Sequence, residues 1–152
     1  MSIIAELGLN NQGLPRLLEQ YEDDLSNYEK DLAIKGKLLG FAIKEQPTRS
    51  AYYGDRAIDL GTLVKHFEAQ VKKVRAGLIR QYNDHFSISL SDRMLEKYID
   101  GEDAYLSMNS LLLEVKELAD KYAMVVDAFN RRGFALRDLT LCHINEIQGV
   151  SL

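Results

Sequence analysis

The middle of the chain carries a group of basic side chains of the kind that bind phosphate groups. Between Leu60 and Tyr82 a single acid, Glu68, stands among five cations: Lys65, Lys72, Lys73, Arg75 and Arg80. Cations on one helix neutralise the phosphates of a nucleic acid, and a nearby aromatic ring stacks on an unpaired base. We therefore take these five residues and Tyr82 as candidate contacts to single-stranded DNA. The alternative is a solvated helix face that pairs with acidic residues of the same protomer.

A second, smaller basic cluster contains Arg131 and Arg132, with Arg137 a little further along the chain. Arg131 and Arg132 are also candidate DNA contacts. The other interpretation is that they stabilise the carboxyl end of a helix, where the helix dipole favours cations.

No catalytic constellation is visible in the sequence. The three histidines, His66, His85 and His143, are far apart, and none has metal-ligand spacing to another His or Cys. Cys142 directly precedes His143, but adjacency in sequence does not bring a base to a thiol, and no supporting motif surrounds the pair. We therefore expect a protein that is not an enzyme and that holds neither a metal nor a cofactor.

The basic residues must be positioned by long helices. One apolar row at alternating spacings of four and three persists over three heptads: Met108, Leu112, Val115, Ala119, Tyr122, Val126 and Phe129. We expect a helix over 101–132, with Asp100 as its N-cap and Gly133 as a left-handed C-cap. So long an apolar stripe must be buried against another long helix, from the same chain or from a partner. These seven residues and Phe134 are therefore candidate oligomerisation residues.

The remaining segments also favour helices, so the chain is expected to be all-α, with three or four helices of which two are long. We expect a loose arm over 1–14, an acidic helix over 15–45 that Pro47 ends, a basic helix over about 50–82, a short helix over 91–99 and a terminal helix over 135–147. Between the basic and short helices, the alternation over 86–90 suggests an extended link.

The composition limits the setting of the protein. The net charge of −4 argues against general affinity for nucleic acids, so any DNA binding must come from local clusters. One cysteine, Cys142, is consistent with a reducing, cytoplasmic location. No apolar run approaches the roughly 20 residues that span a bilayer, and the first residues do not resemble a signal peptide. We expect no membrane association.

Residues 48–140 resemble the UvsY family of recombination mediators from T-even-like phages and cyanophages. Three segments carry the resemblance: Asn130-Arg131-Arg132-Gly133-Phe134-Ala135-Leu136, Tyr98-Ile99-Asp100-Gly101-Glu102-Asp103, and Glu68-Ala69-Gln70-Val71-Lys72-Lys73-Val74. In the family an aromatic pair follows the basic cluster, whereas this chain has only Tyr82 there.

The resemblance implies a homo-oligomer, ring-shaped in the family, that binds single-stranded DNA. It also implies contacts to a RecA-like recombinase and to a single-strand-binding protein, which the recombinase replaces on DNA. The competing hypothesis is a structural or adaptor protein that oligomerises through its long helices and binds only other proteins, through its acidic first helix.

Overall fold

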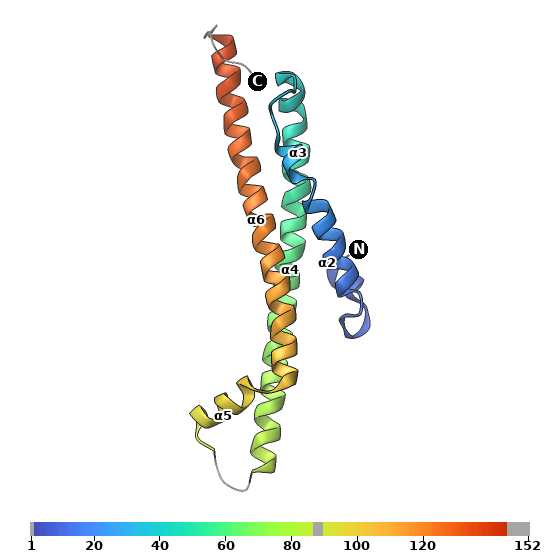
Figure 1. The fold of residues 1–152 in the computed structure, drawn as a ribbon, viewed down its shortest axis with the longest axis vertical. Helices are drawn as coiled ribbons and strands as arrows, with labels where there is room; N and C mark the ends of the chain where they lie inside the picture. The colour runs from blue at the N-terminus through green and yellow to red at the C-terminus, as the bar shows by residue number, and fades with distance from the viewer. Residues whose placement is uncertain (1, 87–89, 146–152) are drawn as a thin grey trace.

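A computed structural model describes residues 2–86 and 90–145, and every regular element in this part of the chain is a helix. Two long helices, α4 (Leu39–His85) and α6 (Asp103–Ile144), run antiparallel along most of the molecule (Figure 1). The short helix α5 (Asp92–Asp100) lies at the lower end of this hairpin. The all-α expectation with two long helices is confirmed. No helix in the described ranges combines the length and apolarity needed to cross a membrane.

The heptad row predicted on α6 packs against α4 of the same chain. Val115, Tyr122 and Phe129 are completely shielded from solvent, as are Leu60 and Phe67 on α4. The long helix that buries this apolar row is therefore α4 of the same chain.

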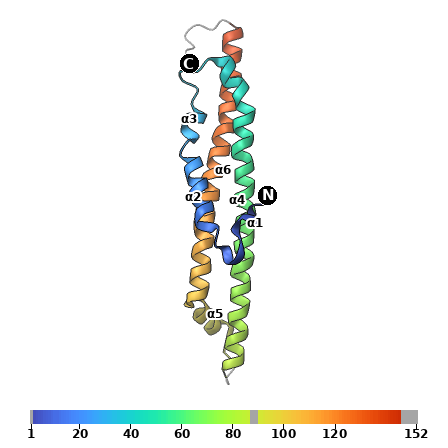
Figure 2. The ribbon, with the colours of Figure 1, turned by 90° about the vertical axis from the view of Figure 1, so that its right-hand side faces the viewer.

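The N-terminal segment is folded along one side of the hairpin (Figure 2). It consists of α1 (Ile3–Leu7), a 3-10 turn (Leu9–Asn11), α2 (Leu14–Leu25) and α3 (Tyr28–Leu32). The expectation of a loose arm over 1–14 is wrong, because Ile3 and Leu7 are buried in the main core.

The expected acidic helix over 15–45 is likewise divided into α2, α3 and the first turns of α4. The Ser26 hydroxyl donates to the carbonyl of Asp23, 2.6 Å away, where α2 ends. Gly36, with φ +82°, reverses the chain before α4 begins. Local turn chemistry at these two points outweighs the continuous helical period of the apolar residues.

Pro47 does not end a helix, because it lies inside α4. A proline in a helix interior removes one backbone hydrogen bond and costs on the order of 3 kcal/mol. Burial on both sides of it holds the helix together: Ala42 and Tyr53 are packed out of solvent, and Gln46 Nε2 donates to the carbonyl of Phe129 at 2.7 Å. The basic segment predicted over about 50–82 is the later part of this continuous helix.

Gly133 is not a C-cap, because α6 continues through it to Ile144. A Cβ at this position would lie 3.2 Å from Gln46 Nε2. The glycine thus gives room to a side chain that crosses from α4, and the expected helices 101–132 and 135–147 are one helix. The short helix predicted over 91–99 is confirmed as α5. Residues 87–89 of the expected link and residues 146–147 lie outside the described part of the chain.

Candidate nucleic-acid interface

Four of the predicted cations lie on one side of α4. Lys65 and Lys72 are seven residues apart, as are Lys73 and Arg80, so the two pairs form adjacent rows within about 100° of the helix circumference. We call these four residues the basic stripe. All four are exposed, and the stripe is about 22 Å long at 1.5 Å per residue. Within the described ranges, no carboxylate makes an ion pair with any of them.

The acid beside the stripe is engaged elsewhere. Glu68 accepts from Lys116 Nζ of α6 at 2.9 Å. This hydrogen bond is the main reason that the pKa of Glu68 is lowered. Lys116 therefore offsets the one negative charge that stands among the stripe lysines.

Arg75 is separate from the stripe. Its guanidinium turns toward α5, where it lies 3.5 Å from Glu96 Oε1 and 3.9 Å from Asp100 Oδ1. The sequence placed Arg75 among the DNA contacts, but in the structure it has two carboxylate neighbours. Its role here is to connect α5 to α4.

Tyr82 belongs to an aromatic cluster of three rings at the lower end of the hairpin. Its ring stacks on that of Phe86 with centroids 5.7 Å apart, and Tyr98 of α5 lies 5.8 Å from Tyr82. The Tyr82 hydroxyl donates to Glu102, which raises the pKa of that tyrosine. Phe86 and Tyr98 are each nearly half exposed.

Sequence reasoning did not include Phe86 and Tyr98 in the site. Phe86 follows Tyr82 four residues later, whereas Tyr98 belongs to α5. The four-residue spacing of Tyr82 and Phe86 on a helix was the signal available for the first of these.

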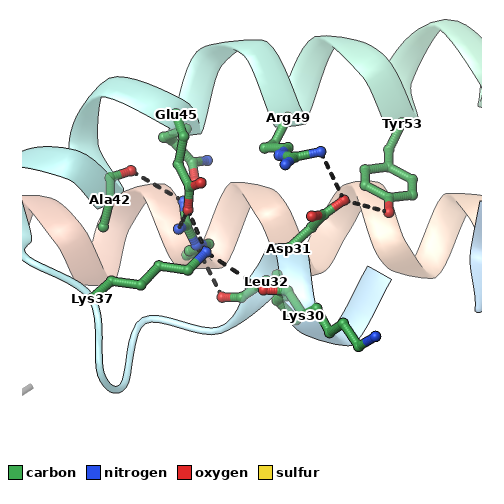
Figure 3. Close-up of polar contacts among 10 residues, drawn as sticks. Lys30, Asp31, Leu32, Lys37, Ala42, Glu45, Arg49 and Tyr53 are labelled. Carbon is green, nitrogen blue, oxygen red and sulfur yellow. Dashed lines mark hydrogen bonds and ion pairs between the residues drawn. The ribbon is translucent and has the colours of Figure 1, made fainter. Parts of the chain in front are cut away.

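Two acids of α2 and α3 pair with arginines that lie outside the stripe. Asp24 of α2 pairs with Arg56 at 2.6 Å, and Asp31 of α3 lies 3.1 Å from Arg49 and accepts from the Tyr53 hydroxyl at 3.0 Å (Figure 3). Both arginines precede the stripe along α4. The acid pairing proposed as an alternative therefore exists, but it involves Arg49 and Arg56 instead of the stripe.

Arg132 was predicted to contact DNA, but the structure buries this residue, which is only 4% exposed. Its guanidinium donates to Glu45 Oε1 at 2.5 Å, Gln46 Oε1 at 2.6 Å, and the carbonyls of Leu32 at 2.9 Å and Ala42 at 3.3 Å. Figure 3 shows Glu45, Ala42 and Leu32 facing this point, together with Lys37, which also pairs with Glu45 at 2.6 Å. Arg132 joins α6, α4 and the end of α3, so it has no free donor face for phosphate.

Arg131 and Arg137 are on the surface. Arg131 has 81% of its side chain exposed and pairs with Asp127 one turn earlier at 2.6 Å. Arg137 lies over the ring of Phe134 and beside Asp138. Neither residue joins the stripe, which is on α4.

Seven of the eight predicted oligomerisation residues pack inside the protomer. Leu112, Val115, Tyr122 and Phe129 are buried, and the half-buried members pack against the same core: Met108, Ala119 and Val126. Phe134 is 60% exposed and is the remaining candidate for an intersubunit contact. The seam thus forms the intrachain hairpin.

Among the described residues, no group of three or more His, Cys, Asp or Glu side chains is arranged to hold a metal ion. Cys142 is half-buried near the end of α6, and His143 beside it is exposed.

No family model, curated protein or solved structure matches this chain. Its function is therefore inferred from the geometry of the stripe and the aromatic cluster.

Proposed function

We propose that this protein binds single-stranded DNA and acts as a recombination mediator of the UvsY type. The observation that carries the proposal is the basic stripe: Lys65, Lys72, Lys73 and Arg80 are exposed on one side of α4, without carboxylate partners in the described structure. The stripe runs toward the rings of Tyr82, Phe86 and Tyr98. Phosphates would follow the cations, and unpaired bases would stack on the partly exposed rings.

The predicted affinity of one subunit is modest. Four phosphate contacts to a single strand release counterions with a slope of about −3 in log K against log salt. Binding should therefore weaken steeply as salt rises. A homo-oligomer would compensate, because several weak stripes acting on one strand raise the overall affinity. Its interface lies outside the heptad seam, which is occupied within each protomer, and Phe134 is the predicted residue that remains available.

As a mediator, the protein would act by binding and positioning, with no chemical step. Strand contacts along α4 would hold DNA while a RecA-like recombinase replaces the single-strand-binding protein. Both partner proteins enter the proposal through the family resemblance of residues 48–140.

The test is fluorescence anisotropy of a labelled single-stranded oligonucleotide across a salt series. In the variant Lys65→Ala/Lys72→Ala/Lys73→Ala, loss of three cations should reduce the slope from about −3 to about −1 and weaken binding at low salt. The matched control replaces three exposed lysines outside the stripe: Lys30, Lys35 and Lys44. Each variant changes the net charge from −4 to −7, so any effect of net charge on DNA binding is the same in both. Equal losses in the two variants would refute the stripe as the site.

The second candidate is a protein-binding adaptor, favoured by apolar side chains at the open end of the hairpin. Phe41, Phe134, Leu141 and Ile144 are each at least half exposed. An oligomer that binds no single-stranded DNA at any salt, measured by light scattering after gel filtration, would favour the adaptor over the mediator.

A further inference from the structure

A mainly apolar pocket with one polar wall borders the basic stripe on α4. Its volume is about 660 Å³, and its lining comes mainly from α4 and from α1 and the 3-10 turn. The ribbon shows α1 lying beside α4 (Figure 2). Its lining includes Asn11, His66, Gln70, Lys73, Val74 and Met108. Lys73 belongs both to this pocket and to the basic stripe.

The pocket is formed by an unusual turn in the N-terminal segment. Gly8 has φ +66°, and Asn10 and Asn11 have φ +55° and +60°, a left-handed conformation that asparagine tolerates better than most residues. Gly13 then packs so closely that a Cβ would lie 2.3 Å from the carbonyl oxygen of Glu6. This packing fixes the turn over α4 and directs Asn11 toward Gln70.

The polar wall is a chain of three side chains. Asn11 Nδ2 donates to Gln70 Oε1 at 2.8 Å, and Gln70 Nε2 lies 3.4 Å from Asn11 Oδ1 and 2.7 Å from His66 Nε2. The contact between Gln70 and His66 links α4 side chains one turn apart. One N–H of Asn11 and the Nδ1 atom of His66 are not used within this chain of bonds.

The rest of the lining is apolar, with Val74 and Met108 among its members. A ligand for such a site has an apolar face and a polar edge that can hydrogen-bond with these side chains. Lys73 adds a cation at the boundary with the stripe, where a phosphate attached to that ligand would lie.

We propose that this pocket is a nucleobase subsite, in which one base of a bound strand lies against Val74 and Met108 with its edge toward Asn11 and Gln70. Lys73 holds the adjoining phosphate. The inference rests on the proposed binding of single-stranded DNA and makes it more specific. It assigns part of the affinity to the bases themselves, at a place separate from the rings of Tyr82, Phe86 and Tyr98.

The test compares a labelled thymidine oligonucleotide with an abasic oligonucleotide of the same length, by anisotropy at low salt. The wild type should bind the base-bearing strand about tenfold more tightly, which lies within the range that contacts to a single base add. In Asn11→Gly/Gln70→Ala, this preference should fall roughly fivefold, with the abasic affinity and the salt slope unchanged. Glycine keeps the left-handed backbone at position 11 without strain. The control Gln20→Ala makes the same amide-to-methyl change at an exposed site on α2.

The outcomes separate the two proposals. A wild type that binds neither strand refutes the proposed function, and with it this inference. A wild type that binds both strands, together with an Asn11→Gly/Gln70→Ala variant that keeps the full preference, refutes the pocket alone. Photocrosslinking with 5-iodouracil oligonucleotides provides a measurement on the unaltered protein. Adducts on peptides that contain His66 or Met108 support the subsite, whereas adducts confined to Tyr82, Phe86 and Tyr98 overturn it.

Discussion

Replacing Arg132 by methionine should destabilise the hairpin far more than the same change at Arg131. Arg132 is buried and donates four hydrogen bonds, to Glu45, Gln46 and two backbone carbonyls. Methionine keeps an unbranched stem that packs like the start of the arginine side chain, but it is shorter and leaves all four acceptors without this donor. Breaking a buried ion pair by removing one partner costs about 3–5 kcal/mol. Glu45 retains its 2.6 Å contact to Lys37, so we expect the lower part of this range, about 3 kcal/mol.

The adjacent residue supplies the control. Arg131 is 81% exposed, and its pair with Asp127 is a surface pair between successive turns, worth about 0.3–0.5 kcal/mol. Urea unfolding followed by circular dichroism at 222 nm gives both free energies under identical conditions. Arg132→Met should lower the unfolding midpoint strongly, and Arg131→Met should hardly change it. Equal, small losses of stability in the two variants would show that the buried guanidinium does not hold α3, α4 and α6 together.

Three further predictions follow from the described contacts. Burial opposes ionisation of Glu45, but Lys37 and Arg132 outweigh it, so the pKa of Glu45 is lowered. The difference in unfolding free energy between wild type and Glu45→Gln should therefore be largest above pH 4.5 and should shrink as the pH falls below that value. Urea unfolding at a series of pH values measures this difference. Burial, and after it the Asp59 carboxylate, raises the pKa of Tyr21 to about 12. The stability that the protonated Tyr21 contributes is therefore complete below pH 10 and is lost as the pH rises through about 12. In a titration followed by absorbance at 295 nm, Tyr21→Phe should lack one of the late steps that wild type shows. Gly13→Ala should lower the free energy of unfolding by about 2–3 kcal/mol, because the new Cβ meets the backbone of Glu6. Gly77→Ala, on the open surface of α4, should instead raise it by about 0.5–1 kcal/mol. Thermal unfolding measures both changes.

The two long helices could be predicted because their apolar periods extend over many turns, and a long amphipathic stripe must be buried. The helix ends were less predictable. Pro47 and Gly133 are strong local signals for a break, yet both lie within helices because Gln46 and Arg132 connect α4 and α6 around them. These contacts join residues more than 80 positions apart, so no local window of sequence contains them.

The same limitation applies to the N-terminal arm. Asn- and Gly-containing sequence over 8–13 is typical of a loose segment, and the few apolar residues around it gave no long period. Burial of Ile3 and Leu7 depends on the packing of α1 against α4 and α2, which lie far from it or after it along the chain.

Residue type and spacing identified the stripe but not the surroundings of each cation. Seven-residue spacing on a helix is enough to place Lys65 beside Lys72. Arg131 and Arg132 are adjacent and chemically identical, yet one is exposed and the other is buried among carbonyls. A rotation of 100° per residue separates them, and Arg132, three residues after Phe129, lies on the side of α6 that faces α4. The acceptors that make burial of its guanidinium possible come from distant segments, Glu45, Gln46 and two backbone carbonyls, which the spacing does not reveal. Tyr98 reaches Tyr82 only through the placement of α5, which explains why it was missed.

The net charge of −4 does not by itself argue against a DNA-binding face, because charges act locally in salt solution. The acids of α2 and α3 that pair with Arg56 and Arg49 do so about 24 and 35 Å before Lys72 along the axis of α4, at 1.5 Å per residue. The Debye length at physiological ionic strength is about 8 Å, so these pairs contribute little to the potential at Lys72. Glu68, one turn before Lys72, does lie within that range, and Lys116 offsets it. A net negative chain can therefore carry a positive stripe on α4, because the local potential there comes mainly from the four cations of the stripe.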